Sequence, residues 1–95
     1  MRLVWSESAR RDLRAQIFFL AERNPDAARR VQAAIRDAVE RLSTYPHRGR
    51  PGRRDGTREL IVVGLPYVII YAMADTELTI LRVLHAAQDW SPDTE

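Results

Sequence analysis

Residues 67–73 read Tyr-Val-Ile-Ile-Tyr-Ala-Met, and this stretch decides the fold class that the sequence predicts. It is rich in β-branched and aromatic residues, which favour strands. The residues at odd and at even positions are both apolar, since Tyr67 and Ile69 alternate with Val68 and Ile70. Because successive side chains of a strand point to opposite faces, we expect this strand to be buried on both faces and to lie at the centre of a sheet.

Two more strands are predicted on either side of this segment, over 58–63 and 77–84. The breaks at 64–66 and 74–76 are short enough for antiparallel hairpins. Upstream, 45–57 holds closely spaced prolines and three of the four glycines, so we predict a loop there.

Two helices are predicted ahead of that loop. Apolar residues recur at spacings of three and four over 6–23, with Ser6 as a suitable N-cap. Asn24 supplies the next cap, and Pro25 suits the first position of a second helix that should end near Ser43. Since almost nothing joins the two helices, they should form an antiparallel hairpin.

The predicted order, which begins with the short apolar run at 3–5, is β-α-α-β-β-β. We therefore expect an α+β fold in which a helical hairpin packs on one face of a mostly antiparallel four-stranded sheet. A length of 95 residues allows one domain, which we place at 1–90, followed by an acidic tail at 91–95.

Composition excludes several classes of protein. The chain has no cysteine, which excludes disulfides, thiolate zinc sites and cysteine nucleophiles and fits a reducing cytoplasm. All 15 basic residues are arginine, and the missing lysine excludes a Walker-type phosphate loop and Schiff-base chemistry. With only two histidines, neither a metal site nor a cofactor is expected. The uncharged stretch 60–74 is shorter than the roughly 20 residues of a membrane-spanning helix.

The net charge of +2 conceals a strong asymmetry. Residues 47–58 hold five arginines and one aspartate, a local charge of +4 (5 − 1) with histidine neutral. Guanidinium groups grip two oxygens at once, so this basic loop suits phosphate, and it suits an acidic protein partner equally well. A loop kept soluble by its charge is the plainer interpretation.

Arg82 lies inside the last predicted strand, where alternation places it on one face with Leu78, Ile80 and Leu84. A guanidinium among leucines must reach solvent, a carboxylate or a ligand. The structural alternative is a pair with Glu59 or another acid across the sheet. His85 follows on the opposite strand face.

The first helix carries more apolar residues than one face can bury, because Phe18 and Phe19 make 17–21 a continuous apolar run. Either Trp5 and the strands cover the excess or a partner does. We favour the first, which places these residues in the core.

Six motifs follow one another along the chain. They are Leu-Val-Trp-Ser at 3–6, Asn-Pro-Asp-Ala-Ala at 24–28, Tyr-Pro-His-Arg-Gly-Arg-Pro at 45–51, Gly-Thr-Arg-Glu-Leu at 56–60, Pro-Tyr-Val-Ile-Ile-Tyr at 66–71 and Ile-Leu-Arg-Val-Leu-His-Ala-Ala-Gln-Asp-Trp at 80–90. Together they closely resemble the RelE/ParE superfamily of toxins from bacterial type II toxin–antitoxin modules. The resemblance runs in order from about 2 to 90, and the superfamily has the β-α-α-β-β-β fold.

The resemblance implies one of two activities. RelE-like members cut mRNA in the ribosomal A site, commonly with basic residues along the strand that here reads Glu-Leu-Ile-Val-Val at 59–63 and directly after the tyrosine that here is Tyr67. ParE-like members lack that set and poison DNA gyrase instead. Because the strand is apolar and Val68 follows Tyr67, the sequence is more similar to the ParE-like branch.

Under the ParE-like hypothesis, the resemblance implies that Arg58, Arg82, His85 and Trp90 line or flank the surface that binds gyrase. The RelE-like alternative makes His85 the acid or base of a ribosome-dependent endoribonuclease, with Arg58 and Arg82 on phosphate. A third hypothesis is an inactive homologue that acts only in an antitoxin–operator complex.

Each hypothesis implies a cognate, ParD-like antitoxin in a hetero-oligomer. Its expected contacts on this chain are Ile17, Phe18, Phe19, Arg48 and Arg50. Contact with DNA is expected only indirectly, through the antitoxin, and neither a membrane nor a small-molecule substrate is expected. Arg82→Ala is expected to abolish toxicity while antitoxin binding survives.

Overall fold

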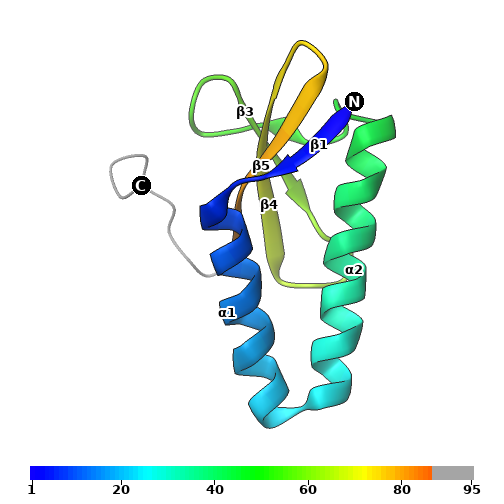
Figure 1. The fold of residues 1–95 in the computed structure, drawn as a ribbon, viewed down its shortest axis with the longest axis vertical. Helices are drawn as coiled ribbons and strands as arrows, with labels where there is room; N and C mark the ends of the chain where they lie inside the picture. Colours follow the sequence, from blue (N-terminus) through cyan, green and yellow to red (C-terminus); the bar gives the residue numbers. More distant parts are fainter. Residues whose placement is uncertain (87–95) are drawn as a thin grey trace.

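The computed structural model describes residues 1–86, so the predicted acidic tail and Trp90 lie outside the described part of the chain. The elements are β1 (Arg2–Trp5), α1 (Glu7–Arg23), α2 (Pro25–Thr44), β2 (Arg50–Pro51), β3 (Thr57–Ile61), β4 (Tyr67–Ala74) and β5 (Glu77–His85). The predicted α+β class and the order of the predicted elements are both confirmed (Figure 1).

The sheet has the strand order β1-β5-β4-β3-β2, which makes β4 its central strand as predicted. β1 pairs with β5 in parallel, and every other pairing is antiparallel. The predicted count of four strands is wrong, because β2 adds a fifth at the edge beside β3. Its two residues are too few to show a strand pattern, and Pro51 has no N–H to donate, which confines it to an edge.

Both faces of β4 are buried, as its sequence predicts. Ile69 and Tyr71 belong to the main core with the helices, whereas Ile70 joins Leu84 in a second, smaller apolar cluster. Residues of α1 and α2 complete the main core, and Ile35 there is fully buried.

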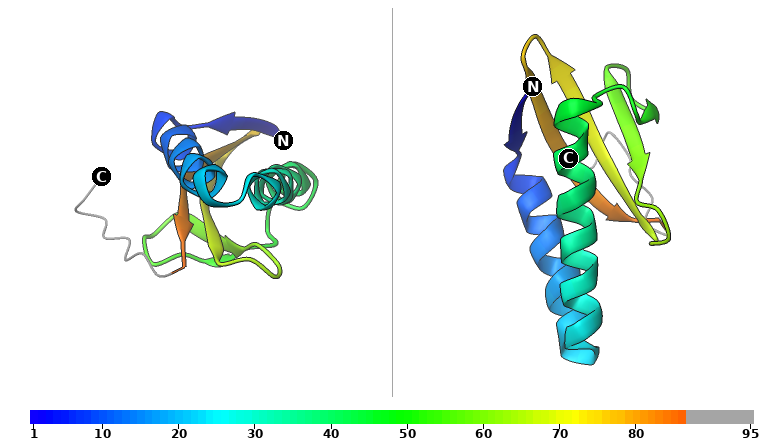
Figure 2. Two further views of the ribbon diagram at one scale, coloured as in Figure 1. Left: turned by 90° about the horizontal axis from the view of Figure 1, so that it is seen from below. Right: turned by 90° about the vertical axis from the view of Figure 1, so that its right-hand side faces the viewer.

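The two helices form an antiparallel hairpin on one face of the sheet (Figure 2). Asn24 ends α1 and caps α2, since its side chain accepts a hydrogen bond from the Ala27 N–H. The end of the hairpin that holds Asn24 projects beyond the strands, while the other end lies against them (Figures 1 and 2). Within residues 1–86, neither helix is long and apolar enough to cross a membrane.

The pairing of β4 with β5 shifts its register once, because Ile70 is opposite Arg82 whereas Tyr71 is opposite Ile80. Leu81 is therefore an extra residue, a β-bulge that inverts the alternation of side chains beyond it. The predicted face of Arg82 is wrong for Leu78 and Ile80, because beyond the bulge Arg82 lies on the opposite face, which it shares with Leu84 as predicted. Leu78 and Ile80 pack in the main core, but after the bulge Val83 takes that role and Leu84 joins the second cluster.

Candidate functional site

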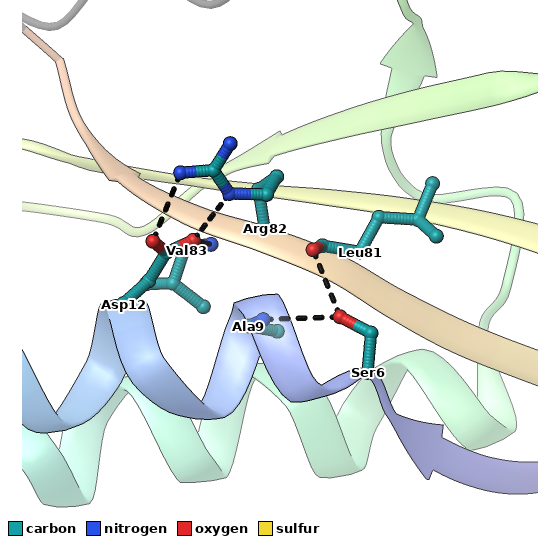
Figure 3. Close-up of polar contacts among 6 residues, drawn as sticks. All are labelled: Ser6, Ala9, Asp12, Leu81, Arg82 and Val83. Atoms are coloured by element: carbon teal, nitrogen blue, oxygen red, sulfur yellow. Dashed lines mark hydrogen bonds and ion pairs between the residues drawn. The ribbon is translucent and has the colours of Figure 1, made fainter. Parts of the chain in front are cut away.

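Helix α1 lies along the edge of β5 beyond the point where the pairing with β1 ends. The pairing of β1 ends where Trp5 lies opposite Ile80, and the Ser6 N–H then donates to the Ile80 carbonyl. The Ser6 hydroxyl accepts from the Ala9 N–H at 3.0 Å and donates to the carbonyl of Leu81 at 2.9 Å (Figure 3). This side chain thus caps α1 and also satisfies the bulged residue of β5.

One turn farther along α1, Asp12 binds the next part of β5. Its Oδ2 accepts from Arg82 Nε at 2.7 Å and from the Val83 N–H at 3.0 Å, while its Oδ1 accepts from Arg82 Nη2 at 3.0 Å (Figure 3). The side chains of Arg82 and Asp12 are only 21% and 15% exposed. The Arg82 pair is therefore a bidentate, largely desolvated contact between helix and sheet, the strongest geometry for a guanidinium and a carboxylate.

This contact settles one alternative for Arg82. The guanidinium does reach a carboxylate, but the acid belongs to helix α1, so the predicted pair with Glu59 or another acid across the sheet is wrong. Asp12 was not singled out by the sequence. Its only signal is its place three residues after Ala9, at the edge of the apolar stripe of α1, since the partners are 70 positions apart.

A groove of ≈310 Å³ lies beside this pair and is lined by Asp12, Gln16, Phe19 and His85, together with Ala15. The His85 ring lies edge-on to Tyr67, with ring centroids 5.6 Å apart. The structure thus brings two predicted site residues, Arg82 and His85, to the same end of β5. It also places Phe19, which was expected in the core, on the wall of the groove that Asp12 and His85 line.

The arginine-rich loop, residues 46–56, is organised around a buried acid. The Glu59 side chain is 3% exposed and accepts from Arg50 Nη2 at 3.3 Å and from the Arg53 N–H at 3.1 Å. The Arg53 guanidinium also lies 3.7 Å from the same carboxylate. Glu59 therefore neutralises part of the charge of the loop and fixes its backbone.

Tyr71 and Arg58 hold the first part of the same loop. The Tyr71 hydroxyl donates to the Pro46 carbonyl at 2.7 Å and accepts from the Gly49 N–H at 2.9 Å. Burial raises the pKa of this phenol, against the opposing effects of Gly49 and Arg58, so it keeps the proton that it donates. A side chain at Gly49 would meet the Tyr71 hydroxyl at 2.7 Å, which explains why this position is glycine.

Arg58 is directed into this loop rather than toward Arg82. Its Nη1 donates to the Gly49 carbonyl at 2.6 Å and to the His47 carbonyl at 3.4 Å. Since β3 is two strands away from β5 in the sheet, the structure does not gather Arg58, Arg82 and His85 into one cluster.

The apolar run of α1 is not covered by the core as expected. Phe18 is 67% exposed and Phe19 is 56% exposed, whereas Ile17 packs partly against the core. The reason is the length of the hairpin, whose far end projects beyond the strands (Figure 1). Phe18 lines a groove of ≈400 Å³ between the helices, with Leu13, Ile17 and Ala21 among its apolar residues and Arg14 and Arg36 among its polar ones. Phe19 stacks against the Arg23 guanidinium.

The residues expected to bind an antitoxin fall in two separate places. Ile17, Phe18 and Phe19 lie on the projecting half of the hairpin, whereas Arg48 and Arg50 lie beyond the C-terminal end of α2. The 20 residues of α2 separate the two sets, a distance of roughly 30 Å along a helix. Trp90 cannot be placed, because it lies outside the described residues.

Comparison with known proteins supplies the biological context for these surfaces. The family described as the ParE toxin of the type II toxin–antitoxin system parDE matches residues 3–90. Protein Y4kP of Sinorhizobium fredii is 43% identical over 94% of this chain and 92% of its own length. Toxin RelE2 of Caulobacter vibrioides is 39% identical over 92% of this chain and 97% of its own length. The fold matches a chain of the chromosomal ParDE system from P. aeruginosa with a TM-score of 0.81 and 26% identity, over 90% of this chain and 95% of that one.

Proposed function

Because this chain belongs to the ParE toxin family of type II toxin–antitoxin systems, within the RelE/ParE superfamily, we propose that it inhibits DNA gyrase and thereby blocks replication. In this proposal the chain acts by binding its target and has no hydrolytic chemistry of its own. A cognate antitoxin keeps it inactive until the antitoxin is lost.

The composition and contacts of β3 carry the proposal. A ribonuclease of this superfamily needs a base for the ribose hydroxyl, an acid for the leaving oxygen and cations over the phosphate. Arg58 is the one basic residue of β3, and its guanidinium is engaged with the carbonyls of Gly49 and His47. Glu59, Leu60 and Ile61 follow it, and Val68 comes directly after Tyr67. This set supports target binding better than phosphodiester cleavage.

The proposed target surface is the end of β5 beside α1. Arg82 and His85 supply polar groups there, and Phe19 supplies exposed apolar area beside His85 and Asp12. Aromatic and arginine side chains are the residues that dominate binding energy in protein interfaces. Arg58 is proposed to contribute by holding the arginine-rich loop in shape. The share of Trp90 in this surface stays a prediction from the sequence.

The proposed antitoxin surface is the groove between the helices. Its apolar floor and its arginines suit an amphipathic helix with acidic flanks, the helix-in-groove mode of recognition. Arg48 and Arg50 offer a second contact for acidic residues at the far end of α2. An antitoxin that reaches both would follow α2 along most of its length.

The test places the purified toxin in two reactions side by side, gyrase supercoiling of a relaxed plasmid and coupled transcription–translation. Inhibition of supercoiling with intact mRNA is the expected result. mRNA cut only when ribosomes are present would overturn the proposal in favour of a RelE-like endoribonuclease, which the similarity to toxin RelE2 keeps as the alternative.

Two controls complete the experiment. Arg82→Ala should lose the inhibition of gyrase and still bind the antitoxin, because Arg82 lies away from the groove between the helices. A wild-type chain that is folded and binds its antitoxin, yet neither inhibits gyrase nor stops growth, would support the inactive homologue instead.

A further inference from the structure

We propose that Asp12 is a positioning residue for Arg82, so that the helix carboxylate and the strand guanidinium act as one unit at the target surface. This inference rests on the proposed function, since it assigns a role to a second residue of the same surface. Asp12 is not among the residues that the sequence motifs single out.

The carboxylate of Asp12 is held in place by the backbone of β5 as well as by Arg82. Its Oδ2 accepts from the backbone N–H of Val83 at 3.0 Å, a group that β1 leaves unpaired because the pairing of β1 ends at Ile80. A carboxylate tied to a strand backbone cannot follow a mobile side chain. The Asp12 side chain therefore defines a fixed point on α1 to which the guanidinium is held.

The guanidinium is held at two of its nitrogens. Nε and Nη2 lie 2.7 and 3.0 Å from the two carboxylate oxygens, which fixes the plane of the guanidinium as well as its position. A flexible arginine loses rotamer entropy when it binds a partner, and prior fixing removes most of that cost. The pair thus holds Arg82 in one orientation against Asp12, which lines a groove together with Phe19 and His85.

The β-bulge at Leu81 is what makes this arrangement possible. Without the extra residue, Arg82 would share the face of Leu78 and Ile80, inside the main core. With it, the Arg82 side chain reaches Asp12 at the edge of the sheet just past the end of β1 (Figure 3). Ser6 binds the carbonyl of the bulged residue itself, so two side chains of the same region stabilise the bulge.

The decisive variant is Asp12→Asn, which keeps the size of the side chain and an acceptor for Val83 but removes the charge. Gyrase supercoiling is measured against toxin concentration at a temperature where circular dichroism shows each variant folded. We expect about a tenfold to hundredfold higher inhibitory concentration, since charge-assisted hydrogen bonds are lost. Asp12→Glu, which keeps the charge, should recover most of the potency.

Glu7→Gln is the matched control, because Glu7 pairs with Arg11 on the same helix but that pair is exposed. It should leave the inhibitory concentration unchanged. The swapped variant Asp12→Arg/Arg82→Asp separates positioning from simple stability. It restores an ion pair, but a guanidinium at position 12 cannot accept from the Val83 N–H, so its potency is compared at a temperature where circular dichroism shows it folded, and it should not recover potency.

Three outcomes are decisive. Full potency of folded Asp12→Asn would overturn the inference, as would recovered potency in the swapped variant, because the pair would then be purely structural. Failure of the wild-type toxin to inhibit gyrase would instead overturn the proposed function. In that case, growth arrest on expression of the same variants still tests whether Asp12 acts through Arg82.

Discussion

The two halves of the helical hairpin have opposite surroundings. Against the sheet, Ala9 and Leu13 of α1 pack with Ile35 and Val39 of α2, and all four are buried. On the projecting half, Phe18 leaves two thirds of its surface exposed. The half against the sheet therefore holds the most deeply buried apolar side chains of the hairpin, whereas the projecting half buries Val31 but also carries apolar surface at Phe18 that the fold of this chain does not cover. Such surface on a small domain indicates a binding site.

The largest effect is expected from a substitution in the half of the helical hairpin that lies against the sheet. Ile35→Ala removes a fully buried side chain from the main core and should lower the free energy of unfolding by about 2–5 kcal/mol. Urea unfolding followed by circular dichroism measures it. A loss below that of an exposed substitution would mean that the helices are held to the sheet by something other than this core.

A smaller effect tests whether the anchored region extends to the arginine-rich loop. Tyr71→Phe removes the hydroxyl that joins Pro46 and Gly49 and leaves the Gly49 N–H without its acceptor, which should cost about 1–3 kcal/mol. Amide hydrogen exchange at Gly49 should accelerate more than exchange in the hairpin. Equal acceleration everywhere would contradict a local role.

The same variant also tests how the stability that Tyr71 contributes changes with pH, and the direction of that change can be predicted. The pKa of Tyr71 is raised above its ordinary value of 10.0 by burial, so the stability that its neutral form contributes is fully present below pH 10 and is lost as the pH rises through the raised pKa. The difference in unfolding free energy between wild type and Tyr71→Phe should therefore shrink above pH 10. Tyr67, whose pKa is also raised by burial, keeps its own alkaline loss in both proteins.

The smallest effect on stability is expected on the projecting half. Phe18→Ser should change the unfolding free energy by no more than about 0.5 kcal/mol, because the side chain is already exposed. The same change should weaken antitoxin binding by about tenfold to hundredfold, as measured by calorimetric titration with the cognate antitoxin. Glu22→Ser, another exposed position of α1, is the matched control. Undiminished binding by Phe18→Ser would remove this half from the antitoxin surface.

The sequence predicts well what depends on neighbouring residues. The observed α1 begins one residue after its predicted cap, and β4 and β5 lie within a residue of their predicted bounds. Caps, turns and alternation are local signals, which explains this agreement.

Features that depend on contacts between residues distant in the sequence are not predicted by such local signals. The bulge at Leu81 inverts the strand faces, and because Leu81 and Leu84 are both apolar, alternation alone cannot reveal it. The pairing of Arg82 with Asp12 depends on the packing of α1 on β5, which local sequence patterns do not describe. The exposure of Phe18 depends on how far the helical hairpin projects beyond the sheet. That distance is set by the length of the helices relative to the length of the strands, which a local stretch of sequence does not show.

The parallel pairing of β1 with β5 has a consequence for how the chain acquires its fold during synthesis. Arg2 lies opposite Glu77, 75 positions away (77 − 2), and β5 is inserted between β1 and β4 in the sheet. Contacts this distant in sequence form late, because the loop must close before they contribute energy. The hairpin can assemble on the ribosome early, but Asp12 has no partner on β5 until that strand has left the exit tunnel. We therefore expect the nascent chain to display the proposed antitoxin groove before it completes the surface on which its toxicity is proposed to depend.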